Sequence, residues 1–306
     1  HHHFGRFIEV GEQEAYVNVP SAAVFTDVFG LSYDDALKWS GYQQFSRTDA
    51  AIDWMVTDNF RSGSPIGYDV TSGQPIVETS YQARGHAKFL DLADTQGGWD
   101  ALHKIYQKYY LEDQASGTPP DTQIGVTHDA FLQIGSEALQ CNLASLFHFW
   151  GVHPSSEAAS QISHFPVCEG VQERIIGYLA SAPRTNEDLR AFHKAKTAIH
   201  ENQLTADVYN LLLSEFDATY GQKIRTTGAE ILKSYFNVDA DGVPSTPAII
   251  NKDISFNLSS PTDVNFSWSA SIDPEGRAMQ YTWVLLNTQS NEVLLSRTWQ
   301  EGTSVT

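Results

Sequence analysis

The sequence predicts a mainly α-helical domain followed by an all-β domain of the Ig-like sandwich type. Three observations lead to this prediction. Apolar residues recur every three or four positions through residues 1–236, which is typical of amphipathic helices. A segment rich in Asp, Gly and Pro then fills residues 237–247 and predicts a linker. In residues 248–306 apolar residues alternate with polar ones, as in strands that bury one face.

Within residues 1–236 the predicted helices have recognisable faces and ends. Asn142 and Asn186 can cap two of them at the start, and Gly151 can end one. The predicted helices lie at residues 22–29, 99–109, 142–150, 186–199, 205–220 and 228–236. Two segments rich in Gly and Pro predict loops, at residues 62–79 and 115–127.

The strands of the second domain are predicted from three alternating runs. These runs centre on Phe256, Phe266 and Trp283. The turn Ile272-Asp273-Pro274-Glu275-Gly276 and the strand after it resemble part of a PKD or fibronectin-like module. About 60 residues are present, against ~100 in a complete sandwich, so the predicted domain could be truncated.

Composition excludes two classes of partner. The net charge of -18 repels phosphate backbones, so the chain is not expected to bind nucleic acid. No run of 18 apolar residues occurs, so no membrane span is expected.

The two cysteines, Cys141 and Cys168, leave two alternatives open. In a secreted protein they would pair and stabilise the fold by ~3 kcal/mol or more. In a cytosolic protein they would be two buried thiols. Their spacing fits neither a zinc ribbon nor a CxxC redox motif.

The N-terminal segment carries a candidate metal-binding pattern. Gly11, Glu14 and Asn18 match the spacing G-x-x-E-x-x-x-N, and the chain opens with three histidines that begin at His1. This arrangement resembles the second half of the active-site motif of M60-like (enhancin-like) zinc metallopeptidases. In that family the first half is HExxH, in which two histidines one helical turn apart bind zinc and the glutamate between them is the general base.

Later segments are also similar to this family. Arg84 to Asp94 followed by Gly97-Gly98-Trp99 resembles the helix and the glycine-tryptophan element behind its active site. The stretch from Asn142 to Gly151, which reads NLASLFHFWG, resembles its N-L-x-x-x-F-x-x-W-G element. These segments are scaffold in the family and carry no catalytic residue.

The resemblance implies a function and a set of ligands. Glu14 would be the third zinc ligand, and His1, if native, the second histidine of HExxH. The parent protein would be a secreted or cell-surface hydrolase that cleaves peptide bonds in extracellular, mucin-like glycoproteins. No complete HExxH occurs in residues 1–306, so this chain is expected to be inactive alone.

Alternatives remain open at each of these positions. His1 to His3 could be the remnant of an affinity tag, and Glu14 could be a solvated or capping residue. Pro20 follows soon after and would interrupt a long ligand helix. The alternative function is a non-catalytic adhesion module that binds glycans or proteins, with the helical domain as its scaffold.

Three further features of the sequence are candidate binding sites. His86 and Arg84 could line a substrate groove. Aromatic residues such as Trp39 could stack on sugar rings, although their helical spacing favours the core.

A calcium loop is the last candidate. Asn237, Asp239 and Asp241 place oxygen ligands at alternate positions before a glycine, as in the first half of a calcium loop. Ala248 stands where such a loop needs a bidentate glutamate, which favours a plain linker.

Overall fold

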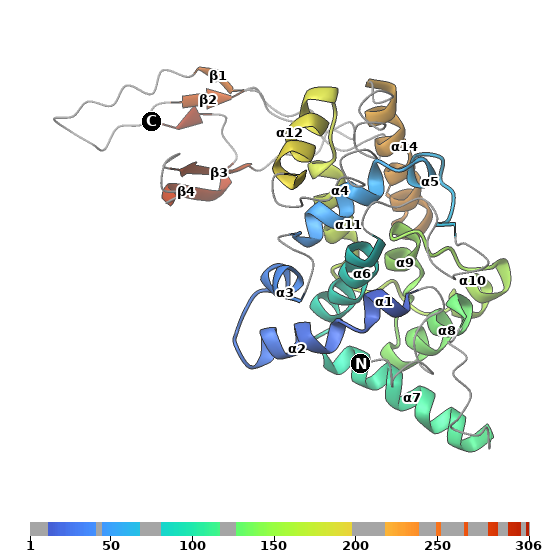
Figure 1. Cartoon of the computed structure of the whole chain (residues 1–306). Coiled ribbons are helices and arrows are strands. Elements are labelled where there is room, and N and C mark those ends of the chain that lie inside the picture. Colours follow the sequence, from blue (N-terminus) through green and yellow to red (C-terminus); the bar gives the residue numbers. More distant parts are fainter. Residues whose placement is uncertain are drawn as a thin grey trace. The chain divides into compact units, whose positions relative to one another are not determined.

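The computed structural model divides the chain into two compact units, His1–Val238 and Asp239–Thr306 (Figure 1). The residues that it describes are 12–40, 45–67, 81–116, 127–197, 218–238, and five strands after residue 248. The boundary between the units falls within the segment predicted to be a linker. None of the described helices is long and apolar enough to cross a membrane.

In its described residues the first unit consists of helices joined by turns and loops, with one isolated β-bridge between Asn142 and Val167. Its helices are α1 (Gln13–Tyr16), α2 (Val19–Asp27), α3 (Tyr33–Trp39), α4 (Arg47–Met55), α5 (Asp58–Arg61), α6 (Tyr81–Thr95), α7 (Asp100–Ser116), α8 (His128–Leu139), α9 (Ala144–Phe149), α10 (Ser156–Ile162), α11 (Val171–Ser181), α12 (Asn186–Thr197) and α14 (Ala218–Phe236).

Hydroxyl side chains begin several of these helices. Each accepts a hydrogen bond from the backbone N–H three positions later, which satisfies one of the unpaired donors of the first turn. The residues that do so are Ser32, Ser46, Thr57, Thr127 and Ser155. Ser46 and Asp49 form a complete capping box. A cap of this kind contributes about 1 kcal/mol, so these helix starts are determined by local sequence.

Helix α6 lies at the centre of the first unit. It packs against α1, α2, α3, α4, α7 and α9. Every residue from Ala83 to Ala93 is buried. That run includes three charged residues, Arg84, Lys88 and Asp91. Because a buried charge is costly without a partner, each of them must be paired inside the protein.

Aromatic rings fill the core around α6. Phe131 lies between Phe89 and Phe147, with ring centroids 5.8 and 5.4 Å apart. On the side of α4 and α5, Phe60 meets Phe149 edge to face at 5.7 Å. Such offset and edge-on pairs add to the stabilisation from burial, so the core joins helices that are far apart in sequence.

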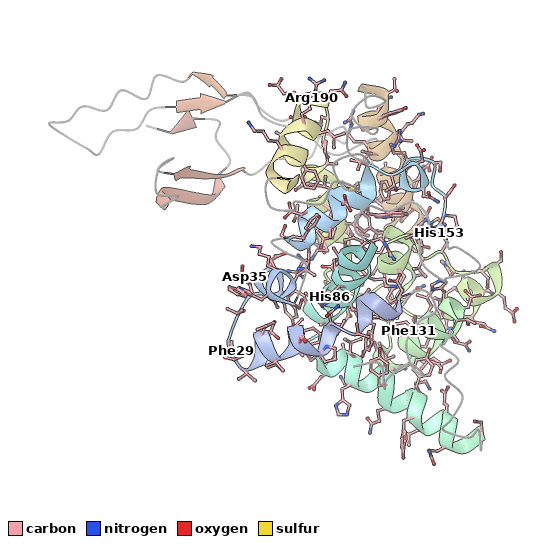
Figure 2. All side chains as sticks on the ribbon, in the orientation of Figure 1. Phe29, Asp35, His86, Phe131, His153 and Arg190 are labelled. Atoms are coloured by element: carbon pink, nitrogen blue, oxygen red, sulfur yellow. A yellow bond between two sulfur atoms is a disulfide. The ribbon has the colours of Figure 1, made fainter. Side chains whose placement is uncertain are left out.

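The predicted helices agree with the structure in part. The helix predicted at residues 22–29 is observed as α2, and Gly30 follows it with a φ of 67°. The helix predicted at residues 228–236 is the second half of α14, which begins at Ala218. Most of the helix predicted at residues 205–220 lies outside the described residues. Phe29, expected on an apolar face, is 65% exposed and lies on the outer side of the unit in Figure 2.

Cys141 and Cys168 form a disulfide, so the structure contains the paired alternative. Their Cα atoms lie 4.9 Å apart. Beside the disulfide, the N–H of Asn142 donates to the carbonyl of Pro166 at 2.7 Å. The Asn142 side chain accepts a hydrogen bond from the N–H of Ala144 at 2.9 Å. The start of α9 is therefore tied to the segment that precedes α11.

The second unit contains strands in two small sheets. β2 (Phe266–Trp268) lies between β1 (Ile249–Asn251) and β5 (Ser304–Val305) and is antiparallel to both. β3 (Tyr281–Leu286) pairs with β4 (Val293–Gln300), also antiparallel, with Val284 opposite Ser296.

The predicted all-β domain of the Ig-like sandwich type is wrong. The described residues are mostly helical, at 72%. The described strands form one three-stranded and one two-stranded sheet, whereas an Ig-like sandwich stacks two larger sheets over a shared core. Alternation along a short run indicates extended backbone only. Strand number and the stacking of sheets depend on pairing between distant segments, which a local pattern does not encode.

Candidate functional site

The candidate residues Glu14, Arg84 and His86 lie on two helices that pack together, α1 and α6. Glu14 belongs to α1, but its side chain lies outside the described residues, as does His1. Arg84 is 1% exposed and His86 is 0% exposed. The structure therefore places both in the interior, where Figure 2 labels His86, and not on an open groove.

A buried ion-pair cluster holds α1 against α6. Glu12, directly before α1, accepts a hydrogen bond from Nη2 of Arg84 at 2.5 Å and from Nζ of Lys88 at 3.2 Å, both to Oε1. None of the three side chains is more than 1% exposed. Arg84 and Lys88 are four positions apart and lie on one face of α6, so a single carboxylate can reach both.

Gly85 allows α1 to approach α6 closely. A Cβ atom at this position would lie 2.1 Å from Oε2 of Glu12 and 2.6 Å from Cβ of Ala15. Neither distance is possible for a real side chain without a shift of α1. Glycine is therefore required here by the close contact between the two helices.

Arg84 also connects α1 with the end of α9. Its Nη1 donates to the backbone carbonyl of Trp150 at 2.7 Å. Gly151 follows with a φ of 84°, and a Cβ atom there would lie 2.6 Å from the ring of Trp54. Trp54 in turn donates to the carbonyl of Phe149 at 2.6 Å. The segment that ends in Trp150-Gly151 is thus a packed junction between α4, α6 and α9.

His86 occupies an interior position on α6. Its Nδ1 lies 3.5 Å from the hydroxyl of Ser40. Burial lowers the pKa of His86 to about 3. The imidazole is therefore uncharged at neutral pH and acts as a buried polar side chain.

Asp91 organises a second buried network one turn further along α6. The hydroxyl of Tyr178 lies 2.8 Å from both carboxylate oxygens, and Nε1 of Trp150 donates at 3.1 Å. Arg47 donates at 3.2 Å, and Arg174 forms an ion pair at 3.6 Å. Burial raises the pKa of Asp91, and the two arginines oppose that rise. The network joins α4, α6, α9 and α11.

Two histidines stack beside the C-terminal part of α14. The rings of His148 and His153 lie 3.9 Å apart, and Nδ1 of His148 is 2.8 Å from the hydroxyl of Tyr235. Burial, and to a smaller extent the neighbouring His153, lowers the pKa of His148 to about 4. Burial likewise lowers the pKa of His153. Both rings are neutral at neutral pH, and the cluster is a hydrogen-bonded structural contact between α9 and α14.

Of the three candidate calcium ligands, the structure describes only Asn237. Asn237 follows α14 with a φ of 53°, and its N–H donates to the carbonyl of Lys233 at 3.2 Å. This left-handed residue ends the helix. Asparagine is the residue most often found in this role apart from glycine. Asp239 and Asp241 lie outside the described residues.

Among the residues that the structure describes, no group of three or more His, Cys, Asp or Glu side chains could hold a metal ion. The described residues therefore do not by themselves form a zinc site. Both proposed ligand side chains, those of Glu14 and His1, lie outside this part of the chain.

No family model, no curated protein and no solved structure matches the chain.

Glu12 is the residue of this site that sequence reasoning missed. The signal was present in α6, where Arg84 and Lys88 stand four positions apart in a run dominated by apolar residues. Two cations on a buried helical face require a carboxylate. The choice of Glu12 over Glu14 could not be read from the sequence, because the two lie in the same short polar segment.

Proposed function

We propose that the parent protein is a secreted or cell-surface zinc metallopeptidase that hydrolyses peptide bonds in mucin-like extracellular glycoproteins. This chain would supply the helical scaffold and the third zinc ligand, Glu14. A second ligand would be His1, and the base and first histidine of HExxH would come from a segment outside this chain.

The observation that carries the proposal is the anchoring of α1. A metal ligand must be held by a rigid support, because small displacements weaken coordination and catalysis. Glu12 is fixed by two buried cations, and Ala15 and Tyr16 are buried on the other side of Glu14. Glu14 therefore stands in a short helix whose neighbours on both sides are locked against α6.

Two other features support the proposal. The segment from Asn142 to Gly151, which resembles the family scaffold, is bound to α6 through Arg84 and to α4 through Trp54. The Cys141–Cys168 disulfide supports an extracellular location, because disulfides persist in oxidising compartments.

The proposal is tested by metal analysis and by activity. The chain is prepared as given and also extended by its natural upstream segment, and both are assayed for bound zinc and for hydrolysis of mucin. We expect about one zinc per chain and activity only in the extended form, because only it would hold a full set of ligands. Glu14→Gln in the extended form should abolish both.

The matched control is Glu157→Gln, which changes an exposed glutamate on α10. It should leave zinc content and activity unchanged. Full zinc binding by the Glu14→Gln variant would overturn the assignment of the ligand. Hydrolysis by the chain as given would overturn the idea that it is inactive alone.

A binding module is the second candidate function, and the exposure of Trp39 favours it. Trp39 ends α3 and is 70% exposed, although its helical spacing predicts a core position. A flat, exposed indole can stack on a sugar ring or bury itself against a protein partner. A glycan array with the whole chain tests this candidate. Trp39→Ala should remove any signal, and Tyr110→Ala, which changes an exposed aromatic on α7, should not.

A further inference from the structure

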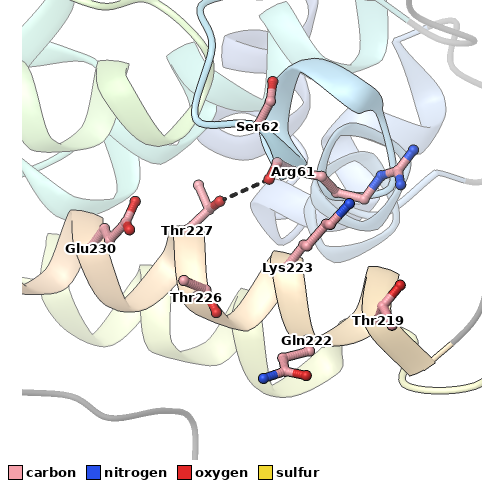
Figure 3. A pocket seen from close by; sticks show the side chains of 8 residues that line it. All are labelled: Arg61, Ser62, Thr219, Gln222, Lys223, Thr226, Thr227 and Glu230. Carbon is pink, nitrogen blue, oxygen red and sulfur yellow. Dashed lines mark hydrogen bonds between the residues drawn. The ribbon is translucent and has the colours of Figure 1, made fainter.

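A polar pocket of about 400 Å³ lies between α5 and the first part of α14 (Figure 3). It is independent of the α1–α6 junction and of the proposed zinc site. The residues that line it are Arg61, Ser62, Thr219, Gln222, Lys223, Thr226, Thr227 and Glu230. The hydroxyl of Thr227 donates to the carbonyl of Arg61 at 3.3 Å and joins the two walls.

Two cations lie at one end of this pocket. The guanidinium of Arg61 lies 3.9 Å from the ring centroid of Tyr220, and Nζ of Lys223 lies 5.5 Å from the same centroid. Figure 3 shows both side chains directed toward the same end, with Glu230 at the other. Arg61 is paired with Asp58, so Lys223 is the cation at this end that can take a further anion.

Arg61 is a fixed charge in the pocket wall. Its Nε donates to the carbonyls of Val56 and Thr57 at 3.2 and 3.3 Å, and its Nη2 pairs with Asp58. Its side chain is only 5% exposed, so it acts on a ligand mainly through its field. A charge that is held in place in this way costs no reorganisation when a ligand binds.

Lys223 is the accessible cation. Its side chain is exposed. Among the described residues, no carboxylate oxygen lies within 4.0 Å of its Nζ, the distance that defines an ion pair. Acidic residues outnumber basic ones in the chain by 37 to 19. The ammonium group is therefore available to an anion from outside.

Further positive charge surrounds the start of α14. The helix begins against the segment that contains Arg184, since a Cβ atom on Gly221 would lie 3.0 Å from the carbonyl oxygen of Arg184. Burial lowers the pKa of Arg184, and the positive charge of the neighbouring Arg225 lowers it further. The carboxylate of Asp188 opposes this shift. Arg184 and Arg225 are therefore neighbouring cations near the start of α14, and Asp188 is a neighbouring carboxylate.

The other end of the pocket has the opposite character. Glu230 supplies a carboxylate, and Gln222 and Thr226 supply further polar groups. A carboxylate accepts hydrogen bonds from hydroxyl groups but repels an anion. The pocket therefore suits a ligand with an oxyanion at one end and hydroxyl groups at the other.

We propose that this pocket binds a hydroxylated carboxylate of the size of an acidic monosaccharide, with its carboxylate at Lys223 and its hydroxyl groups toward Glu230. The ammonium group of Lys223 is a compact positive charge that can donate a charge-assisted hydrogen bond to a carboxylate oxygen. The volume of about 400 Å³ falls within the range of small-molecule sites.

Calorimetric titration of the whole chain tests this proposal with three probes: D-glucuronate, its neutral counterpart D-glucose, and inorganic sulfate. We expect glucuronate to bind at least about tenfold more tightly than glucose, because a charge-assisted contact is lost with glucose. Lys223→Gln should weaken glucuronate binding at least about tenfold. Lys104→Gln, which changes an exposed lysine on α7, should not.

Glu230→Gln separates the two ends of the site. It should weaken binding of glucuronate and should strengthen binding of sulfate, which has no hydroxyl donors and is repelled by the carboxylate. Equal binding of glucose and glucuronate, or an unchanged affinity in Lys223→Gln, would overturn the proposal. Sulfate binding as tightly as glucuronate, with no effect of Glu230→Gln, would overturn the assignment to an acidic sugar.

Discussion

Asp91 has no exposed side-chain surface and is held at once by a phenol, an indole and two arginines. These partners come from α4, from the end of α9 and, for Tyr178 and Arg174, from α11, so one carboxylate on α6 connects four helices. A buried ion pair adds little stability relative to an apolar contact, but removing one partner leaves the other charge buried and unpaired. Individual charged residues in this interior are therefore sensitive to substitution.

Asp91→Asn should destabilise the folded chain by about 1–3 kcal/mol, because it weakens the buried hydrogen bonds to Tyr178 and Trp150, while Arg47 and Arg174 keep Asp94 as a partner. Unfolding in urea, followed by circular dichroism, measures this change. Glu157→Gln, at an exposed position, should stay within about 0.5 kcal/mol of the parent. Equal stability of the two variants would show that Asp91 is not part of a buried network.

His148 should make the stability of the protein depend on pH. Its pKa is about 4 in the folded chain, against 6.5 for an ordinary histidine. Between these values the unfolded chain binds a proton that the folded chain does not, so the free energy of unfolding falls as the pH falls from about 6.5 to about 4. The total loss should be about 1–3 kcal/mol, since the side chain is only half-buried.

His148→Gln removes this titration and keeps a hydrogen-bonding partner for Tyr235. Thermal unfolding measured from pH 7 to pH 4 should show a shallower decline for this variant than for the parent. His103→Gln, which changes an exposed histidine on α7, is the control and should leave the decline unchanged. Parallel pH profiles of the parent and His148→Gln would contradict the prediction.

At the scale of elements, the contact between α1 and α6 depends on glycine. Glycine is a poor helix former by about 1 kcal/mol relative to alanine, so its place in the middle of the central helix needs a reason. The reason is the close approach of Glu12 and Ala15, which leave no room for a methyl group. Gly177 in helix α11 is not needed for a close contact. A Cβ atom added there would meet no atom within 4 Å outside the neighbouring helix backbone.

Gly85→Ala should therefore destabilise the chain by about 1–3 kcal/mol, because α1 must shift and strain the Glu12–Arg84 pair. Gly177→Ala should stabilise it by roughly 0.5–1 kcal/mol, through better helix propensity alone. Denaturant unfolding measures both, and hydrogen exchange of the α1 amides should increase only in Gly85→Ala. A shift in the same direction for both variants would argue against the close contact.

At the scale of the whole molecule, the disulfide closes a loop across a sequence separation of 27 and connects the end of α8 with the start of α11. A link of this length stabilises a fold by ~3–4 kcal/mol, mainly because it restricts the unfolded chain. Both cysteines are used in it, and no free thiol remains.

Reduction should accordingly lower the midpoint of thermal unfolding by roughly 6–16 °C, at about 2–4 °C per kcal/mol for a unit of this size. Calorimetry with and without a thiol reductant measures the shift. The double variant Cys141→Ser, Cys168→Ser should unfold at the lower midpoint and should not respond to reductant. An equal response of the parent and the double variant would indicate an effect of the reductant elsewhere.

Much of the helical part could be predicted from the sequence. The starts of α3, α4 and α8 follow from hydroxyl caps at Ser32, Ser46 and Thr127, and Gly30 marks the end of α2. These signals act over three or four residues, so no tertiary information is needed. The candidate site was predicted less well. Arg84 and His86 were expected on a groove and are buried, and Trp39 was expected in the core and is exposed.

The sequence by itself determined several of the helices, which segments alternate as strands do, and that Cys141 and Cys168 were available to pair. Only the tertiary structure decided that Glu12 holds α1 on α6, that His86 is buried, and that the strands form two small sheets instead of a sandwich. The physical reason is distance along the chain. Capping and periodicity are local, whereas the partners Glu12 and Arg84 stand 72 positions apart, and burial is decided by what folds over a residue from elsewhere.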